Sequence, residues 1–309
     1  MINRLVSLGN VIIDIVAEVP ALPERGGDVL ASGVALEVGG GFNLMAAAVR
    51  QGLEVAYAGA LGHGLFGDLA RRALRAEGIA LLLPDDPGEQ RDTGFDVVLV
   101  DAGGERTFVT GVGAEASVRS QRLDHVKIRP TDAVLISGYG LLHDANRRAI
   151  LDRLRRLPPE TTVCYDPGPL GHTLPDEVVE AVRQRVDWWS CNEREASLAT
   201  GCADPAVAAA QLLVRLRRGN VVVRAGMSGC VLARRGSAIL HLPGVAVTAV
   251  DATGAGDAHL GAFIAGLAAG RDAEAAARRA NVVAALTVTR RGPATSPSAE
   301  ETDRFLADS

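Results

Sequence analysis

Residues 251–257 read Asp-Ala-Thr-Gly-Ala-Gly-Asp, and this stretch is the most informative part of the 309-residue sequence. It follows the apolar run Val245–Val250 and precedes a helical pattern that begins near Gly256. Gly254 and Gly256 allow the backbone to turn tightly and to expose its N–H groups. Because those groups would lie at the positive end of the following helix, the stretch predicts an anion-binding loop built from backbone. The competing interpretation is a plain helix start with Asp257 as N-cap, but a cap needs one acid, not two.

Two more polar motifs precede predicted helices. Gly39-Gly40-Gly41-Phe42-Asn43 comes before a helix predicted over Asn43–Gln51, and Asn192-Glu193-Arg194-Glu195 follows the aromatic segment Trp188–Ser190. Each also fits an ordinary helix start, with Asn43 as an N-cap or with acids in a first turn favoured by the helix dipole. Neither motif decides the function alone.

A third glycine motif, Gly62-His63-Gly64-Leu65-Phe66-Gly67, matches the GxGxxG pattern of dinucleotide sites, after a predicted strand and before a predicted helix. Asp85 and Asp86 follow about 20 residues later, but in a Pro-flanked loop rather than at the end of a second strand. The sequence therefore favours a glycine-rich turn over an NAD site. An NAD-dependent oxidoreductase stays as an alternative hypothesis.

Composition excludes several classes of protein. With 32 Lys+Arg against 37 Asp+Glu the net charge is −5, which argues against a general nucleic-acid binder. The only lysine is Lys127, so no phosphate-loop lysine and no VAIK-type kinase lysine is present. No apolar run approaches the ~20 residues of a membrane span. The cysteines lack CxxC spacing, and we expect a cytoplasmic protein with reduced thiols, Cys164, Cys191, Cys202 and Cys230.

Short apolar runs alternate with helical patterns over most of the chain. Val134–Ser137, Thr161–Tyr165 and Val221–Val223 are candidates for buried strands, and helical patterns separate them. Such alternation predicts an α/β fold with a mostly parallel sheet covered by helices on both faces. Leu5–Leu8 and Val11–Ile15 read as the first strand, with a turn at Gly9-Asn10.

Two stretches interrupt this rhythm. Val29–Val38 alternates weakly, like a half-exposed strand. Asp92–Val100 and Glu105–Gly111 predict a hairpin around the turn Asp101–Gly104. We expect these segments to pair into a small sheet that projects from the core.

Taken together, the motifs resemble those of the ribokinase/PfkB family of small-molecule kinases, from Val6 to about Ser296. Asp251–Asp257 is similar to the DTxGAGD signature, Gly39–Asn43 to GGxxxN, and Asn192–Glu195 to NxxE. Residues 281–292 are similar to the AAxxVTRxGA helix end. The resemblance implies one ribokinase-like domain over residues 1–309, with a Rossmann-like central sheet flanked by helices. It also implies a β-sheet lid formed by segments near 12–38 and 92–112.

The resemblance implies ATP-dependent phosphorylation of an alcohol, usually a sugar hydroxymethyl group. Asp257 would be the base, and the N–H groups of Gly254, Ala255, Gly256 and Asp257 would hold the transferred phosphoryl group. Mg²⁺ would be positioned by Asn192 and Glu195, largely through water. Further groups are implied for the nucleotide, Asn192, Arg224, Gly226, Gly229 and Asn281. Others are implied for the acceptor, Asp14, Gly39, Gly40, Asn43 and Tyr139. A potassium site is implied at Asp251, Thr253, Thr287, Arg290, Gly292 and Ser296.

Some positions depart from the family pattern. Arg224 stands where the TLGxxG motif has Thr, and Tyr139 stands where ribokinase has a sugar-binding Glu. The acceptor therefore need not be ribose. Asp14 ends an apolar run, so we expect it at the carboxyl edge of a central strand, where open α/β sheets bind ligands.

Two alternatives stay open within the family. One is a nucleoside kinase, since Phe42 and Tyr139 could stack on a base. The other is a non-catalytic ligand-binding relative, which would have little need of Asp257. A thin lid sheet with an apolar face needs cover, so we also expect a homodimer formed lid to lid.

Overall fold

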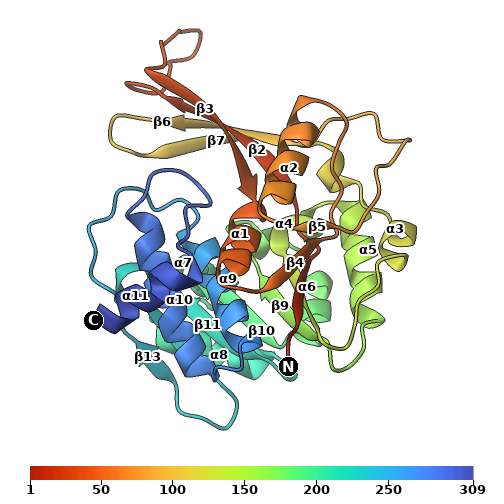
Figure 1. Cartoon of the computed structure of the whole chain (residues 1–309), viewed down its shortest axis with the longest axis vertical. Coiled ribbons are helices and arrows are strands. Elements are labelled where there is room, and N and C mark those ends of the chain that lie inside the picture. The colour runs from red at the N-terminus through yellow and green to blue at the C-terminus, as the bar shows by residue number, and fades with distance from the viewer. Residues whose placement is uncertain (309) are drawn as a thin grey trace.

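A nine-stranded sheet forms the centre of the body in the computed structural model, which describes residues 1–308 (Figure 1). Its strand order is β13-β12-β11-β10-β9-β8-β1-β4-β5. Neighbouring strands are parallel from β5 to β11, and only the edge strands β12 and β13 pair antiparallel, which confirms the mostly parallel sheet. The strands are β1 (Arg4–Ser7), β4 (Glu54–Tyr57), β5 (Ala80–Leu81), β8 (Asp132–Ser137), β9 (Thr162–Asp166), β10 (Trp188–Asn192), β11 (Asn220–Arg224), β12 (Cys230–Ala233) and β13 (Leu240–Leu242).

Helices cover both faces of this sheet. Successive residues of a strand belong to different apolar clusters: Leu5 packs in the cluster of α1, α9 and α10, and Val6 in that of α5, α6 and α8. Strands buried on both faces explain the unbroken apolar runs of the sequence. The helices are α1 (Phe42–Arg50), α2 (Leu65–Ala76), α3 (Ser120–Asp124), α4 (Gly138–Leu142), α5 (Asp144–Arg155), α6 (Asp176–Arg183), α7 (Glu193–Thr200), α8 (Pro205–Arg215), α9 (Ala255–Ala268), α10 (Ala273–Val288) and α11 (Ala299–Asp308).

Within residues 1–308 no single helix is long and apolar enough to cross a membrane. The bent pair α7 and α8 meets the length and composition requirement only when the two helices are taken together.

A second, four-stranded sheet projects from the body, with the order β3-β2-β6-β7 (Figure 1). We call it the small sheet. It consists of β2 (Val11–Glu18), β3 (Gly33–Gly40), β6 (Phe95–Val100) and β7 (Arg106–Gly111). The predicted hairpin is confirmed, since β6 and β7 pair antiparallel with Phe95 opposite Gly111.

The first predicted strand is divided between the two sheets. β1 lies in the large sheet, the chain turns at Gly9-Asn10, and β2 runs on to Glu18 in the small sheet. Asp14 therefore lies in the middle of β2, and the expectation that it ends a central strand is wrong. An apolar run shows that a strand is buried but not which sheet it joins. The turn itself is fixed by a hydrogen bond from Gly41 N to Asn10 O, 2.8 Å long.

The glycine motif Gly62–Gly67 is a turn before α2. The carboxylate of Asp92 accepts hydrogen bonds from Phe66 N at 2.9 Å and from Gly67 N at 2.8 Å. A Cβ on Gly64 would lie 2.5 Å from Oδ2 of Asp92. Because this carboxylate occupies the helix N-terminus, no pyrophosphate can bind there, and the turn interpretation is confirmed.

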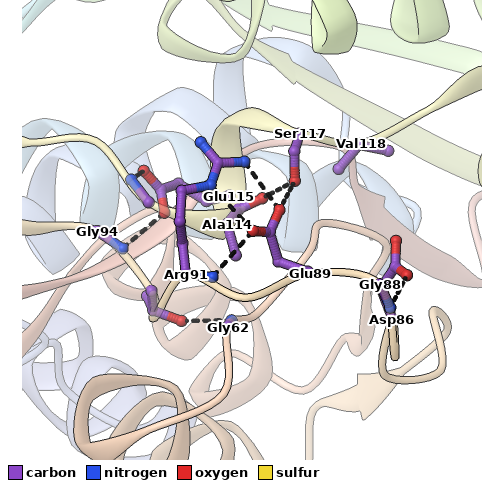
Figure 2. A network of polar contacts seen from close by, with 12 residues as sticks. Gly62, Asp86, Gly88, Glu89, Arg91, Gly94, Ala114, Glu115, Ser117 and Val118 are labelled. Atoms are coloured by element: carbon purple, nitrogen blue, oxygen red, sulfur yellow. Dashed lines mark hydrogen bonds and ion pairs between the residues drawn. The ribbon is translucent and has the colours of Figure 1, made fainter.

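A buried carboxylate fixes the base of the β6–β7 hairpin. Figure 2 shows Glu115 beside Gly94, whose N–H it accepts at 2.6 Å; it also accepts the N–H of Gly113 at 2.8 Å. Asn146 of α5 donates to the backbone oxygen of Glu115 and accepts the N–H of Val118, each at 2.7 Å. Both legs of the hairpin are thus tied to the body at one point.

Candidate active site

The loop before α9 ends in a helix N-terminus that no side chain caps. Gly254 has a φ of 73°, and no side chain accepts the N–H groups of the first turn. In contrast, Asp204 caps α8 and Asp272 caps α10. Asp257 is not the N-cap, because Gly254 occupies that position and Asp257 lies three residues later, in the first turn of the helix. The uncapped N–H groups can bind an anion.

Asp257 is held between α9 and α1. Nδ2 of Asn43 lies 3.4 Å from Oδ2 of Asp257. Asn43 is not an N-cap either, because Gly41 occupies that position. Burial raises the pKa of Asp257 to about 7, and the charge on Asp166 adds to this, whereas Arg224 and the hydrogen bond from Asn43 lower it. A carboxyl group with this pKa can act as a base near neutral pH.

Arg224 is clamped between carboxylates behind the loop. Its Nη1 donates to Asp166 Oδ2 at 2.9 Å and to Ser190 Oγ at 2.7 Å, and its Nη2 lies 3.6 Å from Oε2 of Glu195. A Cβ on Gly256 would lie only 3.3 Å from Nε of Arg224. The guanidinium therefore supplies positive charge directly behind the anion-binding loop.

Asn192 and Glu195 form a capping box at the start of α7. Oδ1 of Asn192 accepts the N–H of Glu195, and Oε2 of Glu195 accepts the N–H of Asn192, both at 2.8 Å. Burial raises the pKa of Glu195, as does the charge on Asp166. Within residues 1–308 no three His, Cys, Asp or Glu side chains are close enough to hold a metal ion by themselves. Asp166 and Glu195 both lie against Arg224, so these carboxylates and Asn192 form one polar cluster at the ends of β9 and β10.

The small sheet brings more carboxylates to the site. Asp14 of β2 and Asp96 of β6 are partners in the strand register, so their side chains lie on the same face. Burial raises the pKa of Asp14 to about 7, with further contributions from Asp96, Glu37 and Asp257. A Cβ on Gly39 would lie 2.2 Å from Oδ2 of Asp14, so the carboxylate requires glycine there. Asp96 was missed by sequence reasoning, although its place opposite Asp14 follows once the strands are registered.

We call Asp14, Glu37 and Asp96 the carboxylate wall. Two more predicted acceptor residues, Asn43 and Tyr139, lie near it. Only 7% of Asn43 is exposed, and its Oδ1 has no hydrogen-bond partner. Tyr139 of α4 is 40% exposed. Burial raises the pKa of Tyr139 to about 12, with the charges on Asp96 and Glu195 adding to the shift. Gly40 has a φ of 61° at the end of β3, which favours glycine. Phe42, in contrast, packs in the core and is not available to stack on a ligand.

The predicted nucleotide segment follows β11. A Cβ on Gly229 would lie 2.1 Å from the Leu242 oxygen, so the chain can approach there only as glycine. Gly226 has a φ of 53° and open space around it. Asn281 donates to the oxygens of Leu242 at 3.1 Å and Pro243 at 3.0 Å, and its Oδ1 meets His259 Nε2 at 3.1 Å. Its amide therefore anchors the loop after β13.

The residues predicted to hold potassium lie around the end of α10. Oδ1 of Asp251 accepts from Thr253 N at 2.9 Å, and Oδ2 accepts from Gly292 N at 3.0 Å. The oxygens of Thr287 and Gly292 both accept from Thr295 Oγ1 at 3.3 Å. The side chain of Ser296 is buried and its Oγ has no partner. The exposed guanidinium of Arg290 contacts Thr295 O and Glu301 instead.

Comparison with known proteins decides the family. The model of the pfkB family of carbohydrate kinases matches residues 2–300. The chain belongs to this family. An uncharacterised sugar kinase of Escherichia coli, YegV, is 30% identical over 95% of this chain and 91% of its own. The ribokinase of Haemophilus influenzae is 27% identical over 99% of both chains. The solved structure of ribokinase from Thermotoga maritima has a TM-score of 0.83 at 24% identity, covering 99% of this chain and 100% of that one.

This PfkB protein thus has the ribokinase-like α/β fold, and it is an ATP-dependent phosphotransferase with an alcohol group as acceptor. The oxidoreductase hypothesis is excluded by the family and by the occupied N-terminus of α2. The conserved fold does not by itself assign the individual residues or the acceptor.

Proposed function

We propose that this kinase transfers the γ-phosphoryl group of ATP to a hydroxyl group, most often a hydroxymethyl group, of an uncharged sugar or sugar-like molecule. The observation that supports it most is the position of Asp257, between the uncapped N–H groups of α9 and the carboxylate wall of the small sheet. The acceptor would lie on the wall with its hydroxyl group against Asp257. The small sheet would act as a lid over it.

Each side of the reaction has its own residues in this proposal. The N–H groups of Gly254, Ala255 and Gly256 would hold the phosphoryl group, and Asp257 would orient and deprotonate the hydroxyl group. Mg²⁺, when bound, would neutralise phosphate charge, held through water by Glu195 and Asn192. Arg224, with its two carboxylate partners, would support the phosphate side rather than bind it alone. The nucleotide would extend along Gly226 and Gly229.

The charge of the wall limits the acceptor. Burial and the charges on Asp96 and Glu37 raise the pKa of Asp14. The basic side chain Arg106 pairs with Asp251. An acceptor that carries a carboxylate or phosphate would meet uncompensated negative charge here. Hydroxyl groups, which can donate to Asp14 and Asp96, fit.

A nucleoside kinase of the same family is the second candidate. Tyr139 is the observation that favours it, because its half-exposed ring could stack on a base. The burial of Phe42 in the core removes the second ring that such a site would use. We therefore place a sugar ahead of a nucleoside.

An acceptor screen tests this function. ATP consumption in Mg²⁺ is measured with ribose, deoxyribose, fructose, ribose 5-phosphate, a ketodeoxygluconate-type acid and adenosine, and products are identified by mass. We expect turnover with a neutral sugar and none with the two anionic compounds. An Asp96→Asn variant should have a lower kcat/KM for the neutral acceptor, by a factor that corresponds to about 1–3 kcal/mol of interaction free energy. Its KM for ATP should be unchanged. Preference for an anionic acceptor would refute the proposed class.

Assembly and location complete the proposal. The outer face of the small sheet carries Val34, Leu36 and Val109, which are 68, 50 and 62% exposed. An apolar sheet face of this kind would be covered in a homodimer formed lid to lid. We propose a cytoplasmic enzyme, in keeping with its free cysteines. Of the groups implied for potassium, Ser296 has a free Oγ that could ligate a cation, but the Asp251 carboxylate already pairs with Arg106.

A further inference from the structure

Arg106 joins the small sheet to the loop that leads into α9. Its Nη2 lies 2.7 Å from Oδ1 of Asp251, 145 residues further along the chain. The Asp251 side chain is only 9% exposed. Figure 1 shows why the two meet, since the β6–β7 hairpin reaches over the blue C-terminal part of the body. A second ion pair, Arg291 to Glu18 at 2.9 Å, joins the same two parts but is exposed.

Asp251 organises the loop that would bind phosphate. Its carboxylate accepts hydrogen bonds from the N–H and the hydroxyl group of Thr253, which directly precedes Gly254. It also accepts a hydrogen bond from the N–H of Gly292, beyond the end of α10. Burial alone would raise the pKa of Asp251, but these hydrogen bonds and Arg106 lower it to about 2. The carboxylate is therefore charged at neutral pH. A largely buried charge of this kind needs a cation beside it.

Arg106 lies at the far end of the hairpin from its anchor. Glu115 holds the base at Gly94 and Gly113, while Arg106 is the first residue of β7, next to the turn. Glu37 of β3 lies close to Gly292, because a Cβ on Gly292 would be 3.2 Å from its Oε1. Burial and the charge on Asp251 raise the pKa of Glu37, and the charge on Arg106 opposes this. One guanidinium thus faces two carboxylates, Asp251 from the body and Glu37 from the small sheet.

We propose that Arg106 is a positioning residue, which fixes the small sheet over the site and supplies at Asp251 the positive charge expected from a monovalent cation. The inference rests on the proposed function, in which the N–H groups of Gly254, Ala255 and Gly256 hold the phosphoryl group. With the hairpin anchored at its base, this is the less exposed of the two ion pairs that hold the outer end of the small sheet. It therefore couples the lid to the loop, and it makes a free potassium ion unnecessary.

Hydrogen exchange tests this without depending on turnover. Amide exchange is followed in wild type, Arg106→Met, Arg106→Lys and Arg291→Met, in tetramethylammonium chloride and in potassium chloride of equal ionic strength. In tetramethylammonium we expect amide exchange at Thr253, Gly292 and the hairpin to become about tenfold faster in Arg106→Met. This is the change expected when one charge-assisted hydrogen bond is lost. Potassium should reverse the change at Thr253 and Gly292, because a small ion can then reach Asp251, but not in the hairpin, which has lost its tether. Arg291→Met, which breaks only the exposed pair, and wild type should not respond to potassium.

Kinetics with the best neutral sugar of the acceptor screen add a functional arm. Arg106→Met should lose about tenfold in kcat in tetramethylammonium and regain it in potassium, and Arg106→Lys should lie between it and wild type. Unchanged exchange in Arg106→Met, or a wild type that potassium activates as strongly as the variant, would overturn the inference. If no acceptor is turned over, the proposed function fails, while the exchange arm still decides the role of Arg106.

Discussion

At the scale of single residues, the proposed chemistry depends on the carboxyl group of Asp257, on whose charge several neighbours act in opposite directions. Burial and Asp166 favour the protonated form of Asp257, and Arg224 and Asn43 favour the charged form, with the result that its pKa is about 7. A base acts only when it is deprotonated, so kcat/KM for the acceptor should rise with pH through about 7 and then level off.

Replacing Arg224 tests that balance. Arg224→Met removes the charge that lowers the pKa of Asp257, so the acid limb of the profile should move to higher pH by about one unit or more. Arg224→Lys keeps a positive charge and should move it less. Both profiles are measured at the same ATP concentration, so protonation of ATP is common to all variants, and melting temperatures identify any loss of folding. An acid limb that stays in place, or moves to lower pH, would show that Asp257 is not the titrating base.

At the scale of elements, the site depends on how closely two helices pack. A Cβ on Gly261 of α9 would lie 2.4 Å from the Leu44 oxygen of α1, so the helices touch through backbone at this point. Asn43 directly precedes Leu44 in α1, and Asp257 lies one turn before Gly261 in α9. Close packing therefore sets the distance between the amide and the carboxylate.

Gly261→Ala should push α1 and α9 apart. Overpacking of this kind costs about 1–3 kcal/mol in stability, and we expect kcat to fall by about tenfold or more because Asn43 no longer reaches Asp257. Gly266→Ala is the matched control: it lies on the same helix, but its Cβ would meet Ala276 of α10 at 2.9 Å. It should lower the melting temperature with little effect on kcat. Equal losses of kcat in the two variants would show that activity does not depend on the distance between α1 and α9.

At the scale of the whole molecule, the alternation of strands and helices could be predicted from the sequence, but the contacts between distant segments could not. The central sheet follows from buried apolar runs, and the anion-binding loop from its glycines. Local pattern could not show that Val11–Glu18 leaves the central sheet, nor that Asp92 fills the N-terminus of α2. The Arg106–Asp251 pair spans 145 residues, and no local spacing encodes it. Asp96 becomes visible only when β6 is placed beside β2.

The proposed dimer is a prediction at the same scale. A lysine at the centre of the apolar outer face would be buried without a partner in a lid-to-lid dimer, so Leu36→Lys should produce a monomer. Sedimentation velocity measures this directly at micromolar concentration. Val214→Lys, at a position 82% exposed on α8, is the control and should leave the dimer intact. A monomeric wild type, or a dimeric Leu36→Lys variant, would contradict the proposed interface.

The most direct test of the central claim is the turnover of Asp257→Asn. The variant keeps the size of the side chain and its contact with Asn43, but it cannot accept a proton. We predict that kcat for phosphorylation of the neutral sugar falls by about 10²–10⁴-fold, while the Kd for Mg-ATP, measured by calorimetry, changes less than about threefold. Asp68→Asn, which alters an exposed acid in the first turn of α2, should behave as wild type. Wild-type turnover in Asp257→Asn would show that the base lies elsewhere, and the account of this site would be wrong.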